Sequence, residues 1–260
     1  MLEVVETPVE PADGKVAAPP LRPPKAVLAM PFGKGVVVTK TFFSLWCAAA
    51  RYGRDQLRFI KQERTLVDEA RNRLVRHYRD EHPDAEYVIM GDDDLIYPFG
   101  NWTSFNAEGK VALPQRYGAL NFFDRLLSHP PSVDIVGGAY FDRKLGGQLQ
   151  CAWGVGSHEK RGFNTDFKNG KIRGLIEMPW VATGAMRIHR SVFDRIEAAM
   201  DRFPEIKPPA NSTAPIGFFV KDRTGVGEDV AFCARAREVG CKVFLDADLR
   251  CLHKSEDVYY

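Results

Sequence analysis

Three consecutive carboxylates, Asp92, Asp93 and Asp94, follow Gly91 and the apolar run at residues 87–90. Aromatic and β-branched residues in that run favour a buried strand. Three like charges beside a buried strand are costly unless a positive group offsets them. A hard divalent cation prefers converging oxygen ligands, such as those of Asp92 and Asp94. The pattern predicts a metal site at a strand's carboxyl end, where open α/β sheets bind ligands, although a solvated acidic turn or a helix N-cap fits the triplet alone equally well.

Length and composition bound the class of protein. A chain of 260 residues with 45% hydrophobic content can bury a sizeable core, and its net charge of +2 is nearly balanced. Five cysteines without CxxC spacing favour reduced thiols in a cytoplasmic setting over a disulfide framework or a zinc site. No apolar run approaches the roughly 20 residues of a membrane span, and the acidic N-terminus is no signal peptide. We therefore expect a cytoplasmic protein.

Alternating strand and helix patterns must position the carboxylates. Residues 1–24 are rich in proline and predict a disordered or loosely docked leader. Apolar runs then predict strands at 26–30, 87–90, 133–140 and 242–245, whereas residues 57–60 form only a brief apolar cluster that stays unassigned. Helical spacing marks residues 41–52, 65–80, 190–200 and 227–239. This alternation predicts one α/β domain over residues 25–260, built on a central mixed sheet.

Several segments match a known pattern in order: Pro31 after the first strand, Ala70-Arg71-Asn72, Gly91-Asp92-Asp93-Asp94, Trp180-Val181-Ala182-Thr183-Gly184-Ala185-Met186, Gly227-Glu228-Asp229 and Leu252-His253-Lys254. Together they resemble the GT-A-fold glycosyltransferases, in particular the family-2-like enzymes of bacteria and phages. The resemblance covers nearly everything after the leader. It implies a GT-A (Rossmann-like) fold with a central mixed, mostly parallel sheet flanked by helices. It also implies metal-dependent, inverting transfer of a sugar from a nucleotide-sugar donor to an acceptor hydroxyl.

The resemblance implies roles for the acidic residues. Asp229 would be the general base that takes the acceptor proton, with Glu228 beside it orienting the acceptor. Both residues also suit the first turn of a helix, where negative charge favours the macrodipole. Asp92, Asp94 and His253 would bind Mn²⁺ or Mg²⁺, and the imidazole favours Mn²⁺. A surface histidine near the chain end is the alternative for His253.

Other residues would hold the substrates. The resemblance also implies that the donor is a UDP- or GDP-sugar. Its nucleotide would contact Pro31 after the first predicted strand, Arg71 and Asn72 in the helix at 65–80, and Asp92 and Asp93 after the second predicted strand. Trp180 could form a platform for the sugar or acceptor, although a single tryptophan equally fits a core. Gly184 would belong to the segment beneath the acceptor site.

The acceptor is the least defined partner. Nine Lys and Arg residues stand against four Asp and Glu residues between Arg51 and Arg79, so one face could be basic. A basic face would suit DNA with hydroxymethylated bases, and an anionic glycan fits equally. Two other functions stay open. A sugar nucleotidyltransferase would show a glycine-rich basic signature, of which Gly33-Lys34-Gly35 is a faint echo, and a non-catalytic binding domain would not need Asp229.

Overall fold

A computed structural model describes residues 25–32, 39–63, 65–97, 104–105, 111–113, 122–140, 166, 171–222 and 224–253. The predicted leader at residues 1–24 and the loop at residues 33–35 lie outside the described residues. Within the described part, no helix combines the length and the apolar character needed to cross a membrane.

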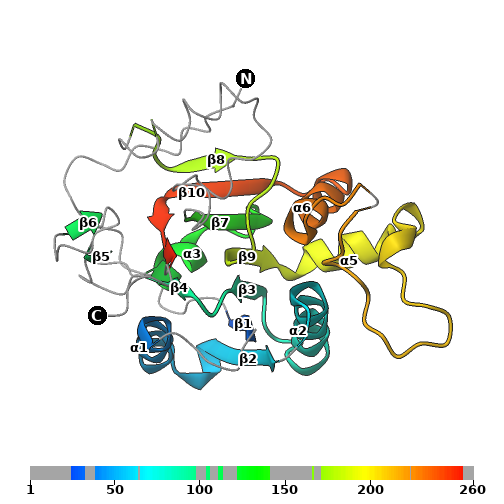
Figure 1. Ribbon diagram of the computed structural model, residues 1–260, viewed down its shortest axis with the longest axis horizontal. Coiled ribbons are helices and arrows are strands. Elements are labelled where there is room, and N and C mark those ends of the chain that lie inside the picture. Colours follow the sequence, from blue (N-terminus) through cyan, green and yellow to red (C-terminus); the bar gives the residue numbers. More distant parts are fainter. Residues whose placement is uncertain are drawn as a thin grey trace.

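A seven-stranded mixed sheet forms the centre of the fold, in the order β2-β1-β3-β9-β7-β10-β8 (Figure 1). Its strands are β1 Ala26–Phe32, β2 Leu57–Glu63, β3 Tyr87–Gly91, β7 Ile135–Ala139, β8 Leu175–Glu177, β9 Ala185–His189 and β10 Val243–Arg250. The pairs β1–β2, β1–β3 and β7–β10 are parallel, and β8 and β9 run against their neighbours. Five of the seven strands therefore share one direction, and the predicted mixed, mostly parallel sheet is confirmed.

The edge strand β2 explains why residues 57–60 stayed unassigned. Within it Leu57 and Ile60 are buried, whereas Phe59 and Lys61 are exposed. Each face of β2 is therefore only partly buried. A strand with one buried face shows strict alternation, and a strand with two buried faces shows a continuous apolar run, so the sequence of β2 fits neither pattern.

Helices cover both faces of the sheet, as the apolar stripes predict. They are α1 Thr39–Gln56, α2 Val67–Glu81, α3 Phe122–Ser128, α5 Arg190–Ala198 and α6 Glu228–Glu238, with short turns η2 Met200–Arg202 and η3 Pro204–Ile206. Figure 1 shows α1 and α3 on one face, and α2, α5 and α6 on the other. The apolar face of α2 carries Leu74, Val75 and Tyr78, which are buried against the sheet. Burial of one apolar face is what stabilises an amphipathic helix.

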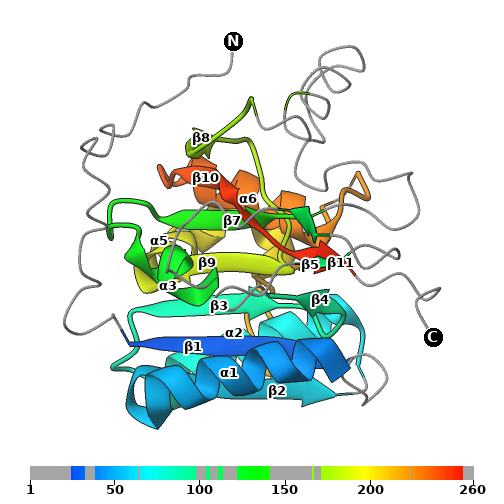
Figure 2. The same cartoon turned by 90° about the vertical axis from the view of Figure 1, so that its left-hand side faces the viewer.

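Chain segments distant in sequence meet at one edge of the sheet. There β1 ends at Phe32, β3 ends at Gly91 and β7 ends at Ala139, while β9 begins just after Gly184. Two small ribbons complete the strand set: β4 Leu95–Ile96 with β11 Leu252–His253, and β5 Ser104–Phe105 with β6 Val111–Leu113. Figure 2 shows β4 and β11 at this edge, which is where an open α/β sheet binds ligands.

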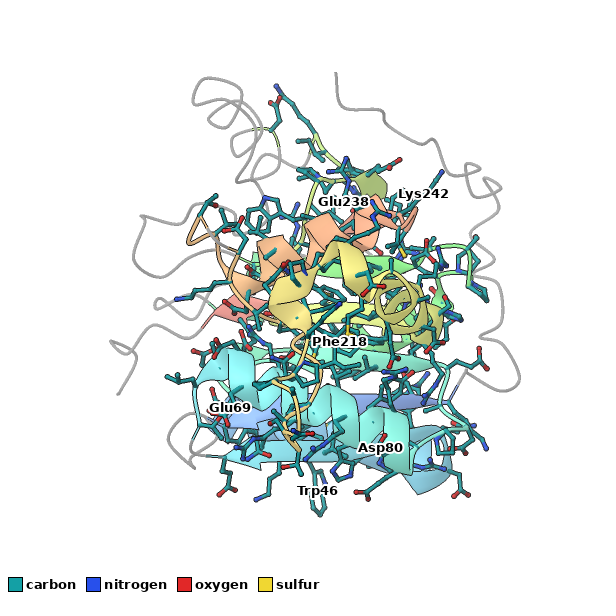
Figure 3. The ribbon with its side chains drawn as sticks, turned by 90° about the vertical axis from the view of Figure 1, so that its right-hand side faces the viewer. Trp46, Glu69, Asp80, Phe218, Glu238 and Lys242 are labelled. Carbon is teal, nitrogen blue, oxygen red and sulfur yellow. The ribbon has the colours of Figure 1, made fainter. Side chains whose placement is uncertain are left out.

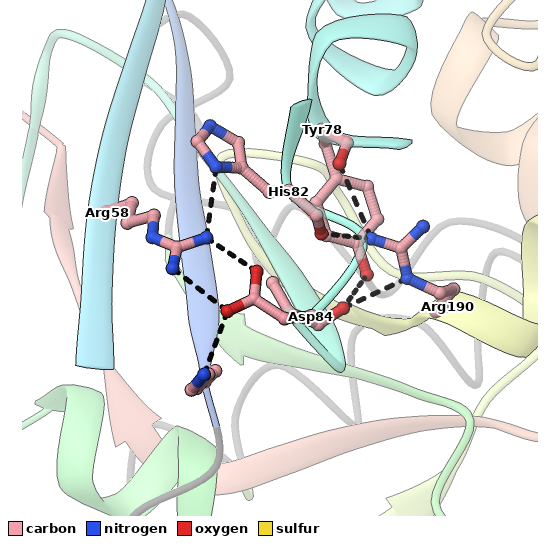
Figure 4. Close-up of polar contacts among 7 residues, drawn as sticks. Arg58, Tyr78, His82, Asp84 and Arg190 are labelled. Carbon is pink, nitrogen blue, oxygen red and sulfur yellow. Dashed lines mark hydrogen bonds and ion pairs between the residues drawn. The ribbon is translucent and has the colours of Figure 1, made fainter. Parts of the chain in front are cut away.

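The opposite edge of the sheet is closed by polar contacts around the turn between α2 and β3 (Figure 4). Arg58 donates two hydrogen bonds to Asp84, at 2.7 and 2.9 Å, and Lys25 donates a third at 2.8 Å. Arg190 donates to the carbonyl of Ala85 at 3.0 Å. These contacts hold the turn in place. They lie at the end of the sheet opposite to Asp92, Asp93 and Asp94.

Candidate functional site

Arg71 connects two acidic segments of the sequence. Its side chain lies in the second turn of α2 and is only 4% exposed. One terminal nitrogen donates to Oδ1 of Asp92 at 3.0 Å, and the other donates to Oε1 of Glu228, 157 residues away. Burial by itself lowers the pKa of Arg71, but the charges of Asp92 and Glu228 outweigh it and raise that pKa. The guanidinium therefore stays charged and joins the end of β3 to the start of α6.

A cleft of about 300 Å³ opens beside this ion pair. Its walls come from the ends of β1 and β2, the start of α2 and the acidic turn after β3: Pro31, Phe32, Gln62, Thr65, Val67, Ala70, Arg71, Asp92, Asp93 and Asp94. This volume is at the lower end of the range for ligand pockets. The predicted residues Pro31, Arg71 and the acidic triplet are therefore brought together around one ligand-sized space.

Two buried tyrosines hold the floor of the site, and sequence reasoning missed both. The Tyr97 hydroxyl accepts from the backbone N–H of Asp92 at 2.9 Å and donates to the carbonyl of Gly184 at 2.8 Å. The Tyr140 hydroxyl accepts from the N–H of Gly184 at 3.1 Å. Burial raises the pKa of both tyrosines well above its usual value, so both hydroxyls stay protonated. The sequence offered one local signal for them: Tyr97 comes shortly after β3 and Tyr140 directly after β7, and both strands end beside the acidic turn.

Gly184 is held against the acidic turn. A Cβ atom at this position would lie 2.7 Å from Oδ2 of Asp92 and 2.7 Å from Leu95. We expect Gly184→Ala to displace the Asp92 carboxylate and to destabilise the protein by about 1–3 kcal/mol, the usual cost of overpacking. Urea unfolding and Mn²⁺ titration of the variant measure the two effects.

Gly240→Ala is the matched control for that substitution. Gly240 has a φ of 81°, and a Cβ there would meet nothing within 4 Å. The control should lose stability through backbone strain but bind metal as the wild type does. Equal Mn²⁺ binding by the two alanine variants would contradict the expectation that a side chain at position 184 displaces the Asp92 carboxylate from a metal site.

Asp229 lies next to Glu228 at the start of α6. Its Oδ1 accepts from the backbone N–H of Val230 at 2.8 Å. Burial raises the pKa of Asp229, the neighbouring charge of Glu228 raises it further, and the cation of Arg71 counteracts both. A carboxylate whose pKa is raised accepts a proton more readily than an ordinary aspartate does.

Excess negative charge makes the site suitable for a divalent cation. Five of the six charged side chains named above are acidic, namely Asp92, Asp93, Asp94, Glu228 and Asp229, and the sixth is Arg71. Carboxylate oxygens are the ligands that Mg²⁺ and Mn²⁺ prefer. Across the described residues, no three His, Cys, Asp or Glu side chains already converge on one ion position. The side chain of His253 is outside the description, but its backbone pairs with Leu95, directly after Asp94, so the predicted ligand set stays a prediction.

Two predicted contact residues have other partners. Asn72 is 6% exposed, and its side-chain amide bonds both the N–H and the carbonyl of Phe219. Trp180 is 7% exposed and packs in the hydrophobic core, whereas a sugar platform needs an exposed ring face. The structure therefore gives Asn72 a role in holding the backbone and gives Trp180 a role in the core.

The predicted basic face is largely neutralised. Between residues 51 and 79, six of the seven described basic side chains bind carboxylates and the seventh, Arg76, donates to the carbonyl of Thr213. The six are Arg51 with Asp124, Arg58 with Asp84, Lys61 with Glu63, Arg71 with Asp92 and Glu228, Arg73 with Glu69, and Arg79 with Asp194 and Glu197. Charges paired in this way contribute little to binding a polyanion.

No family model and no curated protein matches the chain. Among solved structures, it superposes on the crystal structure of A197 from STIV with a TM-score of 0.50 and 13% identity, over 91% of this chain and 97% of that one. The fold is GT-A-like, as the sequence predicts.

Two further structures overlap less well. One is GalNAc-T7 with UDP, GalNAc and Mn²⁺ (TM-score 0.41, 9% identity, 88% of this chain and 43% of that one). The other is a glycosyltransferase involved in glycosylation of the major capsid of PBCV-1 (TM-score 0.43, 10% identity, 88% and 93%). Overlaps this partial carry no inference about activity.

Proposed function

We propose that the protein is a metal-dependent glycosyltransferase that moves a sugar from a nucleotide-sugar donor to an acceptor hydroxyl. One observation carries the proposal: Arg71 joins Asp92, which lines the cleft, to Glu228, the neighbour of Asp229. A donor-side carboxylate and a base candidate with a raised pKa therefore lie within one connected site. The ordered motifs that resemble the GT-A glycosyltransferases support the same conclusion.

The acidic turn would serve the donor. Asp92 and Asp94, with His253 beside them in the β4–β11 ribbon, would hold Mn²⁺ or Mg²⁺. The cation, when bound, neutralises the charge that builds up on the departing diphosphate. Pro31 and Asp93 would contact the nucleotide of a UDP- or GDP-sugar, because both line the cleft next to the acidic turn. Arg71 adds a fixed positive charge on the α2 side of the same cleft.

Asp229 would serve the acceptor. As the acceptor oxygen attacks the anomeric carbon, its proton passes to the Asp229 carboxylate and the bond from that carbon to the nucleoside diphosphate breaks. Direct attack from the side opposite the leaving group inverts the configuration at that carbon. Glu228 is engaged by Arg71, so it orients the acceptor and does not act as a second base.

A glycan is the acceptor class that we favour over DNA. The basic residues that suggested a polyanion in the sequence are largely paired with carboxylates, so they add little positive potential for a duplex. Hydroxymethylated DNA and simple glycans can be compared directly as acceptors once a donor is known. The rival functions, a nucleotidyltransferase or a binding domain, need no general base at the position of Asp229.

A screen of nucleotide sugars, with and without Mn²⁺, tests the proposal. We expect one donor to stabilise the protein by about 2.7 kcal/mol at a concentration 100 times its dissociation constant, and only when metal is present. Thermal shift and release of nucleoside diphosphate are the measurements. Asp94→Ala should abolish the stabilisation. Asp84→Asn, a carboxylate variant at the opposite edge of the sheet, should retain it. Failure of every nucleotide sugar to bind with any divalent metal would refute the proposal.

A further inference from the structure

We propose that Asn72 and Arg235 are positioning residues that anchor residues 218–220 and thereby set the place of Asp229. We call residues 218–220, Phe218-Phe219-Val220, the anchor segment. It precedes α6, which begins with Glu228 and Asp229. The inference rests on the proposed function, since it concerns the placement of the proposed base.

The side-chain amide of Asn72 forms hydrogen bonds with both backbone groups of Phe219, in the middle of the anchor segment. Its Oδ1 accepts from the N–H of Phe219 at 2.7 Å, and its Nδ2 donates to the carbonyl of Phe219 at 3.0 Å. Asn72 is 6% exposed and Phe219 is fully buried. Breaking one such bond leaves the buried N–H or C=O group without a partner, which costs more than the bond contributes. The pair therefore fixes both the position and the orientation of this peptide.

Arg235 holds the same segment from the other side. Its Nη2 donates to the carbonyls of Phe218 and Val220, at 3.0 and 3.1 Å, and its Nη1 lies 3.2 Å from Glu205. Arg235 is 4% exposed and lies in the second turn of α6. The helix that carries Asp229 is therefore tied directly to the anchor segment.

Aromatic contacts tie the anchor segment to α5 and α6. Phe219 stacks on Phe232 of α6, with ring centroids 4.4 Å apart, and Phe218 packs edge-on against Phe193 of α5 at 5.1 Å. Figure 3 shows Phe218 between α2 and α5. Because α2, α5 and α6 all contact it, a shift of the anchor segment requires a shift of the helices around it.

Asp222 ties together the described residues between the anchor segment and α6. Oδ1 of Asp222 accepts from the N–H groups of Thr224 and Val226, both at 2.9 Å. Two residues further on, Glu228 binds Arg71, the sequence neighbour of Asn72. The adjacent residues Arg71 and Asn72 of α2 thus hold the chain at Glu228 and at Phe219. Loss of either contact should shift the start of α6 and with it Asp229.

The donor side of the site should be insensitive to the anchor segment. The cleft is lined by residues of β1, β2, α2 and the acidic turn, and no residue of the anchor segment is among them. A positioning role therefore predicts a lower kcat with unchanged donor affinity. Misplacement of a catalytic group by about 1 Å can cost 10²-fold in rate. A purely structural role predicts lower stability with both parameters unchanged.

The test combines hydrogen exchange with kinetics in the full-length chain. The variants are Asn72→Ala and Arg235→Met, with Arg235→Lys as the conservative change and Leu126→Ala in α3 as a destabilised control. Leu126 is fully buried in the helix layer on the other face of the sheet. We expect residues 218–229 to exchange about tenfold faster in Asn72→Ala and Arg235→Met but not in Leu126→Ala. The kcat of Asn72→Ala and Arg235→Met should fall about 10²-fold. The kcat of Arg235→Lys should lie between those values and that of the wild type. Donor affinity should be unchanged in all variants.

Two results would overturn the inference. One is unchanged exchange at residues 218–229 in Asn72→Ala and Arg235→Met. The other is faster exchange with a kcat no lower than that of Leu126→Ala. If the wild type transfers no sugar from any donor, the proposed function fails separately, and exchange alone decides whether Asn72 and Arg235 hold the start of α6.

Discussion

Asp229→Asn should lower kcat by about 10²–10⁴-fold, the contribution typical of a general base. The amide keeps the size of the side chain and cannot accept the acceptor proton. Donor binding in the presence of Mn²⁺ should be unchanged, because the cleft residues are separate from Asp229. Steady-state transfer assays, together with donor titrations, separate the two effects.

The pH profile gives an independent check on this role. The base works only when deprotonated, so activity should fall as pH falls through the pKa of Asp229. Burial and the charge of Glu228 raise that pKa, so the acidic limb of kcat should lie above the ordinary aspartate value of about 4. Glu238→Gln, at the far end of α6, is the matched control and should leave the profile unchanged. A fully active Asp229→Asn enzyme would exclude Asp229 as the base.

Arg71→Met should be the most destabilising single change in the site. Arg71 is 4% exposed, and its removal leaves Asp92 and Glu228 without their shared cation. Breaking a buried ion pair costs about 3–5 kcal/mol. The side chains of Asp92 and Glu228 are 27% and 15% exposed, so water screens their charges in part and we expect a loss at the lower end, about 3 kcal/mol. Urea unfolding at neutral pH measures this loss.

The same substitution should change the pH profile in a defined direction. The Arg71 cation lowers the pKa of Asp229, so its loss should raise that pKa and move the acidic limb of kcat to higher pH. Arg73→Met is the matched control on α2, because Arg73 forms an exposed i,i+4 pair with Glu69 that contributes about 0.5 kcal/mol or less. An Arg71→Met profile that coincides with that of the wild type would contradict the electrostatic link between Arg71 and Asp229.

The sequence by itself determined most of the elements and the place of the acidic turn that lines the cleft. Apolar periodicity is a local property, so it predicted β1, β3, β7, β10 and the helices α1, α2, α5 and α6 within a few residues. The acidic triplet followed a strand, and the carboxyl ends of parallel strands share one edge of a sheet. Ordered motifs along the chain then predicted the GT-A-like fold.

Only the tertiary structure decided which side chains meet. Asn72 has a partner 147 residues away in Phe219. The hydroxyls of Tyr97, which follows β4, and Tyr140, which follows β7, both bind the backbone of Gly184, which precedes β9. Trp180 is buried because of the elements around it, and no local pattern distinguishes a core tryptophan from a platform. Partners of this kind depend on how distant segments pack, because hydrogen bonding and burial act through space, whereas periodicity and turn chemistry act along the chain.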